Sequence, residues 1–240
     1  PAKTIDRLLH PPSGAAEFNA LFDGYDSAAA TGSTNESPRA WWLRRMIETP
    51  HPLLEKMTLF WHGHFAFGDH AIGSAALMTR FVQSLRQGAL GSYRSLVAGV
   101  MNDPALYLSL RAQRSRRAQP ASNVARQLLA AFGVGPGNFN EQDLSAAARA
   151  LTGQSVLRNE LRFFGHDHDG GPKTLLGQEG NWNPDDAVRI VAEHPATSEQ
   201  VVRKLYAWLI SECDEPEPGL LEPLASHLQE HDDVGRLVEI

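Results

Sequence analysis

The sequence predicts a mainly α protein, a multi-helix globular bundle with one small inserted β-hairpin. Apolar residues recur every three or four positions along most of the chain, which is the spacing of an amphipathic helix. Two short runs, Val156–Phe164 and Lys173–Leu176, instead have the residues of strands. We therefore expect an irregular N-terminal segment over residues 1–36 and a single helical domain over 37–240, with the hairpin inserted at about 154–177.

The composition is that of a globular chain with a sizeable core. The chain has 240 residues, of which 42% are hydrophobic and 21% charged. Its net charge of −6 argues against a nucleic acid or an anionic membrane as the main partner. No apolar run is long enough for a transmembrane segment, and with Cys213 as the only cysteine no intrachain disulfide can form. The composition leaves the oligomeric state and any partner protein open.

The densest apolar run, LLEKMTLFWHGHFAF over residues 53–67, also carries polar residues. In an unbroken helix His62 shares a face with Glu55, while His64 points into the apolar stripe. One metal ion can take both imidazoles only if the helix ends near Gly63. The alternative is that His64 is a hydrogen-bonded core histidine and that Glu55 and His62 form an ordinary polar pair.

Most of the other predicted helices begin at a capping residue or a first-turn proline. Asn140 with Asp143, and Thr197 with Gln200, have the spacing of capping boxes. In chain order the helices are expected over 37–49, 74–87, 93–101, a short stretch from 103, 123–132, 140–151, and from 183, 197 and about 220 onward.

The loop between the two predicted strands is dense in polar residues, with His166, Asp167, His168, Asp169 and Lys173 close together. Imidazoles and carboxylates at this spacing can ligate zinc or iron. The loop can equally be a hydrogen-bonded Asx-type turn that closes the hairpin. The sequence leaves both readings open.

Several of these segments together resemble a known bacterial family. LLEKMTLFWHGHFAF, DPALYLSL, SNVARQLLAAFGVG followed by FNEQDLSAAARALTG, and HDGGPKTLLGQEG stand in the order of the family catalogued as domain of unknown function 1800. The resemblance runs from about Trp41 to Val238. It implies an exported or periplasmic location and a chain from the middle of the family domain, and it supplies no activity.

The resemblance also marks polar positions that recur in the family. They are Glu55, Lys56, Trp61, His62, His64, Asn123, Arg126, Arg149, Thr152, Gly153, His168, Asp169 and Lys173. Three positions depart from the family pattern, where glutamates are typical and this chain has Ser122, Gln127 and Ala130. If the family uses those carboxylates in chemistry, this copy is weakened or inactive.

Two functions follow as hypotheses. The first is a metal-dependent hydrolase, in which the two histidine-bearing segments converge on one divalent ion (zinc, iron or manganese) that activates water. Its metal ligands would be His62, His64, His166, His168 and Asp169, with Glu55, Lys173 and Arg126 as catalytic residues. The second is a non-catalytic helical binding or scaffolding module, in which the same side chains form a structural hydrogen-bond network.

Overall fold

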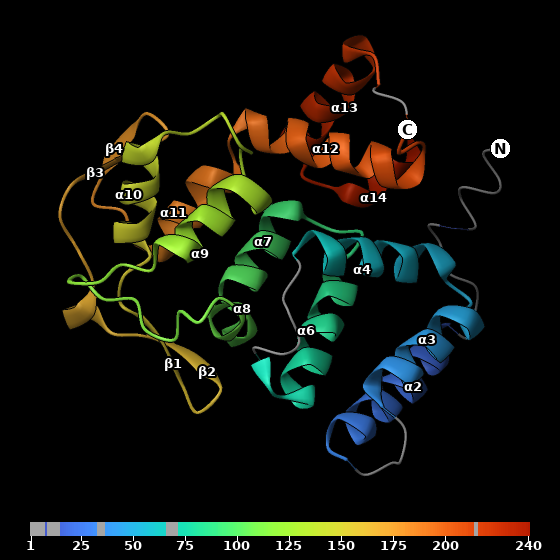
Figure 1. Cartoon of the computed structure of the whole chain (residues 1–240). Coiled ribbons are helices and arrows are strands. Elements are labelled where there is room, and N and C mark those ends of the chain that lie inside the picture. Colours follow the sequence, from blue (N-terminus) through green and yellow to red (C-terminus); the bar gives the residue numbers. More distant parts are fainter. Residues whose placement is uncertain (1–7, 9–14, 33–36, 66–71, 214–215) are drawn as a thin grey trace.

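The structure, a computed structural model, is mainly α with two small antiparallel sheets of two strands each, which confirms the predicted fold class (Figure 1). It describes residues 8, 15–32, 37–65, 72–213 and 216–240. Within this part of the chain, no helix combines the length and apolar character that crossing a bilayer requires.

The first described helix corrects the prediction for residues 1–36. Helix α2 covers Ala15–Ala30, where an irregular segment was expected. It packs along helix α3 (Pro38–Glu48). The aromatic rings of Phe18, Phe22 and Trp41 form a small cluster between the two helices, with centroids 4.4 Å (Phe18–Phe22) and 6.3 Å (Phe22–Trp41) apart. This contact with a distant segment stabilises a helix whose own apolar pattern is weak.

The next helices surround the pocket that is described below. They are α3 (Pro38–Glu48), α4 (Pro52–His64) and α6 (Ala75–Gly88). Proline stands in the first turn of α3 and α4, and the Ser37 and Ser74 hydroxyls cap α3 and α6. The predicted helix starts are therefore confirmed here.

The rest of the chain adds helices around one continuous apolar core that reaches from α4 to α14. In order they are α7 (Tyr93–Met101), α8 (Pro104–Ser109), α9 (Ser122–Arg126), α10 (Glu141–Ala150), α11 (Pro184–Ala192), α12 (Pro195–Leu209), α13 (Pro218–His231) and α14 (Val234–Glu239). The predicted capping box of Asn140 is present, but α12 begins before Thr197 because the His194 ring caps it.

A π-helix follows α9 directly, where the sequence predicted ordinary helix up to residue 132. It spans Gln127–Phe132 and ends at Gly133. A π-turn leaves carbonyls without their usual intrahelical partners, and distant side chains fill the gap. Gln200 donates to the carbonyls of Ala130 and Ala131 at 3.2 and 3.3 Å.

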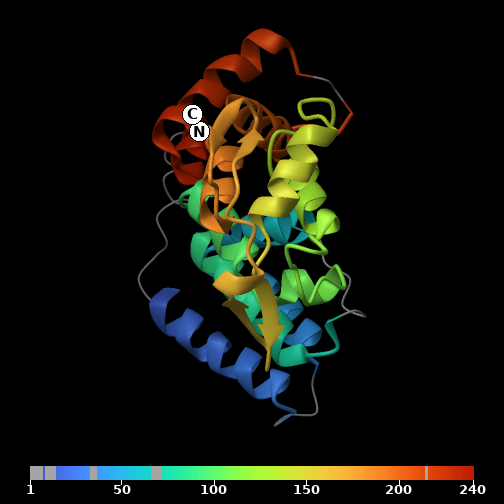
Figure 2. The ribbon, with the colours of Figure 1, turned by 90° about the vertical axis from the view of Figure 1, so that its left-hand side faces the viewer.

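The hairpin region differs from the prediction in its pairing. Strand β1 (Gln154–Leu157) pairs with β2 (Glu160–Phe163), and β3 (Lys173–Leu175) pairs with β4 (Gln178–Gly180). Both hairpins lie on the same side of the molecule (Figures 1 and 2). The sequence predicts Val156–Phe164 as one strand, but a turn at Arg158 and Asn159 bends the chain back and divides this stretch into two paired strands.

Candidate functional site

Glu55 lies at the centre of a buried charged cluster, the Glu55 cluster, which also contains Trp42, Arg45 and Arg86. Its side chain is 2% exposed, and its Oε1 accepts hydrogen bonds from Arg45 Nε at 3.0 Å and Arg86 Nε at 2.7 Å. Its Oε2 accepts from Trp42 Nε1 at 3.1 Å and Arg86 Nη2 at 3.2 Å. Both oxygens of the predicted catalytic carboxylate are therefore occupied by side chains of the protein.

The cluster continues through Arg45 into α2. Arg45 Nη1 lies 2.5 Å from Asp23 Oδ1 and 3.6 Å from Asp26 Oδ2, and Nη2 donates to Asn19 at 2.8 Å. Arg45, Glu55 and Arg86 thus connect four helices through buried charge pairs. Removing one partner of such a pair strongly destabilises the folded protein, because the other charge stays buried without compensation. This positions α2, α3, α4 and α6 relative to one another.

His62 lies beside the cluster without belonging to it. Glu55 and His62 do not form the polar pair that was considered from the sequence. Instead the Trp42 indole contacts both, donating to Glu55 and packing edge-on against the imidazole with ring centroids 5.2 Å apart. Burial lowers the pKa of His62, so the ring is neutral near pH 7. No hydrogen-bond partner for this ring occurs in the described residues.

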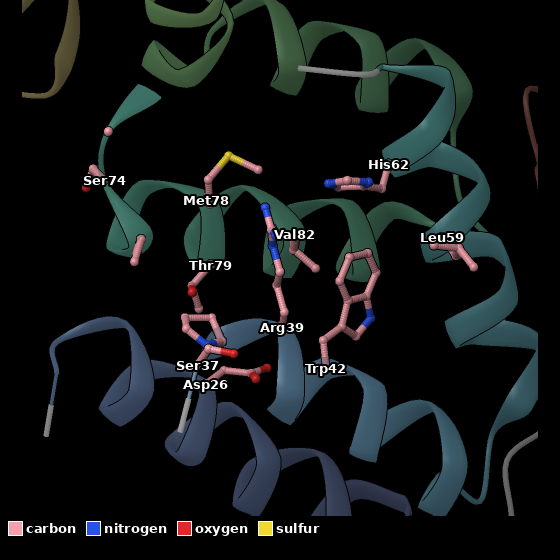
Figure 3. A pocket seen from close by; sticks show the side chains of 13 residues that line it. Asp26, Ser37, Arg39, Trp42, Leu59, His62, Ser74, Met78, Thr79 and Val82 are labelled. Carbon is pink, nitrogen blue, oxygen red and sulfur yellow. The ribbon is translucent and has the colours of Figure 1, made fainter. Parts of the chain in front are cut away.

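Residues of α2, α3, α4 and α6 line a cavity of about 650 Å³, here called the α3–α6 pocket. Figure 3 shows the His62 ring projecting from α4 toward Trp42 and Arg39 of α3, with Met78, Thr79 and Val82 on α6. The described residues that line it are Asp26, Ser37, Pro38, Arg39, Trp42, Leu59, His62, Gly73, Ser74, Ala75, Met78, Thr79 and Val82. The walls are mainly apolar, as is usual for small-molecule sites.

Asp26 is the acidic group of this pocket. The residue is 5% exposed, and its carboxylate accepts no hydrogen bond from the part of the chain that the structure describes. Burial raises the pKa of Asp26 above its usual value, while Arg86 and Arg45 act against this shift. Its recorded charge contact is Arg45 Nη1 at 3.6 Å, which is longer than a hydrogen bond, so the carboxylate can still accept a hydrogen bond from a donor that enters the pocket.

His64 belongs to a different environment, a chain of hydrogen bonds over the π-helix. Lys204 Nζ lies 3.4 Å from His64 Nδ1 and donates to the Ala131 carbonyl at 3.0 Å. Tyr93 donates to the Phe132 carbonyl at 2.5 Å, and its oxygen lies 3.1 Å from His64 Nε2. Because the ammonium can only donate, Nδ1 accepts and Nε2 carries the proton.

Burial, and to a lesser extent the Lys204 charge, lowers the pKa of His64 to about 3. The ring is therefore neutral at physiological pH and acts as a hydrogen-bonded core histidine, which was one of the two readings of the sequence. Lys204 and Tyr93 were not singled out from the sequence. Nothing local marks them, because their partners lie on the π-helix and on α4, which are distant along the chain.

Asp169 lies in the loop of residues 166–173, the Asp169 loop, and pairs with Arg149 of α10. Its oxygens accept from Arg149 Nε at 2.8 Å and Nη2 at 3.2 Å. These bonds hold the pKa of Asp169 well below its usual range. Asp169 Oδ1 also accepts from the Gly171 N–H at 3.0 Å, so an Asx-type turn is present. It does not close a hairpin as the sequence suggested, because β2 and β3 on either side of it belong to separate sheets.

The other candidate residues in and near this loop have separate positions. Lys173 is 3% exposed and donates to the carbonyls of Asp169 and Gly171. His168 Nδ1 lies 3.0 Å from the Thr152 carbonyl, whereas the His166 side chain is 77% exposed. Arg126, also exposed, has Glu141 at 3.8 Å as its nearest carboxylate.

The structure does not bring the two histidine-bearing segments together. His64 contacts residues of α7, α12 and the π-helix, while His168 contacts Thr152 and Phe163, so the two rings share no neighbour among the residues that the structure describes. No group of three or more His, Cys, Asp or Glu side chains among the described residues is placed to hold a metal ion. Binding of zinc, iron or manganese stays a prediction, which metal analysis of protein purified without a His-tag can test.

The departures from the family pattern lie on α9 and the π-helix. Ser122 is exposed, and Gln127 and Ala130 are half-buried. Carboxylates at these positions would thus stand at or near the helix surface. None of these three positions belongs to the Glu55 cluster or to the described lining of the α3–α6 pocket.

The fold and this site define a mainly helical protein whose buried arginine–carboxylate contacts frame a ligand-sized pocket. The chain belongs to the family described as "Protein of unknown function (DUF1800)", whose sequence profile matches residues 1–239. This match extends further toward the N-terminus than the segments that carry the resemblance in the sequence. Searches of curated proteins and of solved structures find no match to the chain.

Proposed function

We propose that the protein is a helical binding module that takes a small amphipathic molecule in the α3–α6 pocket. The pocket volume of about 650 Å³ is within the range of roughly 300–1,000 Å³ that is typical of ligand sites. The observation that carries the proposal is the Asp26 carboxylate, which is buried in the pocket wall without a hydrogen bond from the described residues.

The lining suggests how the ligand would lie. Its apolar body would pack between the Trp42 indole and the side chains of Leu59, Met78 and Val82. A ligand N–H or O–H group would donate to Asp26 and supply the hydrogen bond that this carboxylate lacks. The neutral His62 ring, which also lacks a partner in the described residues, offers a second polar contact beside Trp42.

The Glu55 cluster would then support the pocket instead of carrying out chemistry. Its hydrogen bonds fix the Trp42 ring that forms one wall, and they fix α3 against α4 and α6. A pocket whose walls are rigid loses little conformational entropy when a ligand enters, which favours affinity.

The proposal can be tested with N-phenyl-1-naphthylamine, a neutral aromatic probe with one N–H donor whose fluorescence rises in apolar surroundings. We expect saturable binding to the wild type and at least tenfold weaker binding to Val82→Trp, which fills the pocket. Asp26→Leu should also weaken binding, because the probe loses its acceptor. Leu43→Trp is the matched control, since Leu43 is 60% exposed and lies outside the pocket lining.

Two outcomes would contradict the proposal. One is that the probe gives no saturable signal with the folded wild type. The other is that Val82→Trp, with an unchanged circular dichroism spectrum, binds the probe as tightly as Leu43→Trp does.

A further inference from the structure

A second cavity lies beside the first hairpin, far in sequence from the α3–α6 pocket. It has a volume of about 460 Å³ and is called the hairpin groove here. Its lining consists of Asn102, Gln154, Leu161, Phe163, Asn183, Pro184 and Asp185. These residues come from β1 and β2, the end of α7 and the start of α11.

The strand register explains why one face of the hairpin forms the groove wall. Gln154 pairs with Phe163 across the two strands, and directly paired residues project to the same face. Leu161 is on that face too, because alternate residues of a strand share a side. Leu157 and its partner Glu160 project to the other face, and neither lines the groove.

Gln154 is the residue that points to a ligand. It is only 6% exposed, and its side-chain amide makes no hydrogen bond within the described part of the chain. A primary amide can donate twice and accept twice, and the polar atoms of this one, although the residue is mostly buried, stay accessible from the groove. Because this amide lines the groove, a molecule bound there can form the missing hydrogen bonds.

The remaining lining narrows the chemical class of that molecule. Asn102 and Asp185 add an amide and a carboxylate, and the structure records no hydrogen bond of either side chain among the residues it describes. The Phe163 ring is 50% exposed and gives the groove an aromatic wall. The described residues of the lining include no Lys, Arg or His, so they offer a phosphate or another anion no cationic partner.

We propose that the hairpin groove binds a pyranose sugar. Sugar hydroxyls both donate and accept, which matches the amides of Gln154 and Asn102 and the acceptor oxygens of Asp185. The apolar C–H face of a pyranose ring can pack on Phe163 in the way that apolar groups pack on aromatic side chains. This site is independent of the α3–α6 pocket and of its ligand.

Saturation-transfer NMR with cellobiose, maltose and N,N′-diacetylchitobiose tests the proposal on the full chain. We expect transfer to at least one of these disaccharides with the wild type. Phe163→Ala and Gln154→Leu should each lower the affinity at least tenfold, the first by removing the aromatic wall and the second by removing the amide at nearly constant volume.

The control is Leu157→Ala, which removes an apolar side chain, 45% exposed, from the opposite face of the same hairpin. It should bind as the wild type does, and so should Val82→Trp, which separates this groove from the other pocket. Transfer to none of the three sugars would overturn the proposal. Retained binding in Phe163→Ala, or an equal loss in Leu157→Ala, would also overturn it.

Discussion

The Glu55 cluster and the Asp169 loop both pair a carboxylate with arginine, yet they have different consequences. Glu55 contacts two arginines that lie 10 and 31 residues away and so joins separate helices. The Asp169 carboxylate pairs with Arg149, 20 residues away, and its other hydrogen bond closes its own turn. The first is a tertiary contact in the core, and the second fixes one loop on one helix.

The two regions also differ in the polar groups that they leave without partners. Arg86 Nη1 and Thr79 Oγ1 are buried without a hydrogen bond from the described residues. Thr79 lines the α3–α6 pocket, while Arg86 lies on the same helix outside the lining. No buried side-chain nitrogen or oxygen of the Asp169 loop, which is described in full, lacks a partner. Unsatisfied groups beside a cavity indicate a place for a ligand, whereas a satisfied loop indicates a structural role.

Glu55→Ala should produce the largest effect and so provides the strongest test of this comparison. It leaves the Arg86 guanidinium buried without a carboxylate and removes one of the partners of Arg45. We expect the free energy of unfolding, measured with urea, to fall by about 3–5 kcal/mol. Glu48→Ala is the control, because within the described part of the chain Glu48 forms an exposed ion pair with Arg44. Its loss should cost at most about 0.5 kcal/mol. Equal losses in both variants would contradict the assigned role of Glu55.

Asp169→Asn should lower the free energy of unfolding less, by about 1.5 kcal/mol, which is the low end of the range for hydrogen bonds to charged groups. We expect the low end because Arg149 is partly exposed and solvent screens its charge. The pKa of Asp169 is depressed in the folded state, so its contribution is complete above the unfolded value of about 3.9 and is lost as the pH falls below it. The stability difference between wild type and variant should therefore be constant from pH 5 to 8 and shrink at lower pH. A loss as large as that of Glu55→Ala would remove the distinction between the two regions.

How much of this comparison can be predicted from the sequence depends on the range of the contacts. Helix α4 follows from its local apolar spacing and the first-turn proline, and the Asx turn follows from Asp169 and the glycines after it. The β1–β2 hairpin does not, because Arg158 and Asn159 turn the chain with φ values of 53° and 63°, and an Arg-Asn pair is a weak signal for such a turn. The grouping of Glu55 with two arginines depends on tertiary packing, which no spacing along the chain reports.

His64 extends the comparison to a buried polar residue that carries no charge. Its pKa is about 3 in the folded protein and about 6.5 when unfolded. Between these values the unfolded state binds more protons, so stability falls as the pH decreases. His64→Gln cannot titrate, and we expect the stability advantage of the wild type over this variant to shrink by about 1.4 kcal/mol from pH 8 to 5.5. Urea unfolding at both pH values measures this, and an unchanged difference would show that His64 titrates normally in the fold.

Thr79→Val should change the free energy of unfolding least, and it should raise this free energy, whereas the preceding substitutions lower it. The Thr79 hydroxyl is buried on α6 without a hydrogen bond from the described residues, and valine replaces it with a methyl group of similar size. Removing an unsatisfied polar group should raise the free energy of unfolding, by up to about 1 kcal/mol. Thr152→Val is the matched control in the Asp169 loop region, where the hydroxyl donates to the Arg149 carbonyl and accepts from the Asp169 N–H. It should destabilise the protein, because valine leaves both backbone groups without that partner. Urea unfolding should therefore give changes of opposite sign for the two substitutions, which distinguishes the unsatisfied hydroxyl on α6 from the satisfied one beside the Asp169 loop.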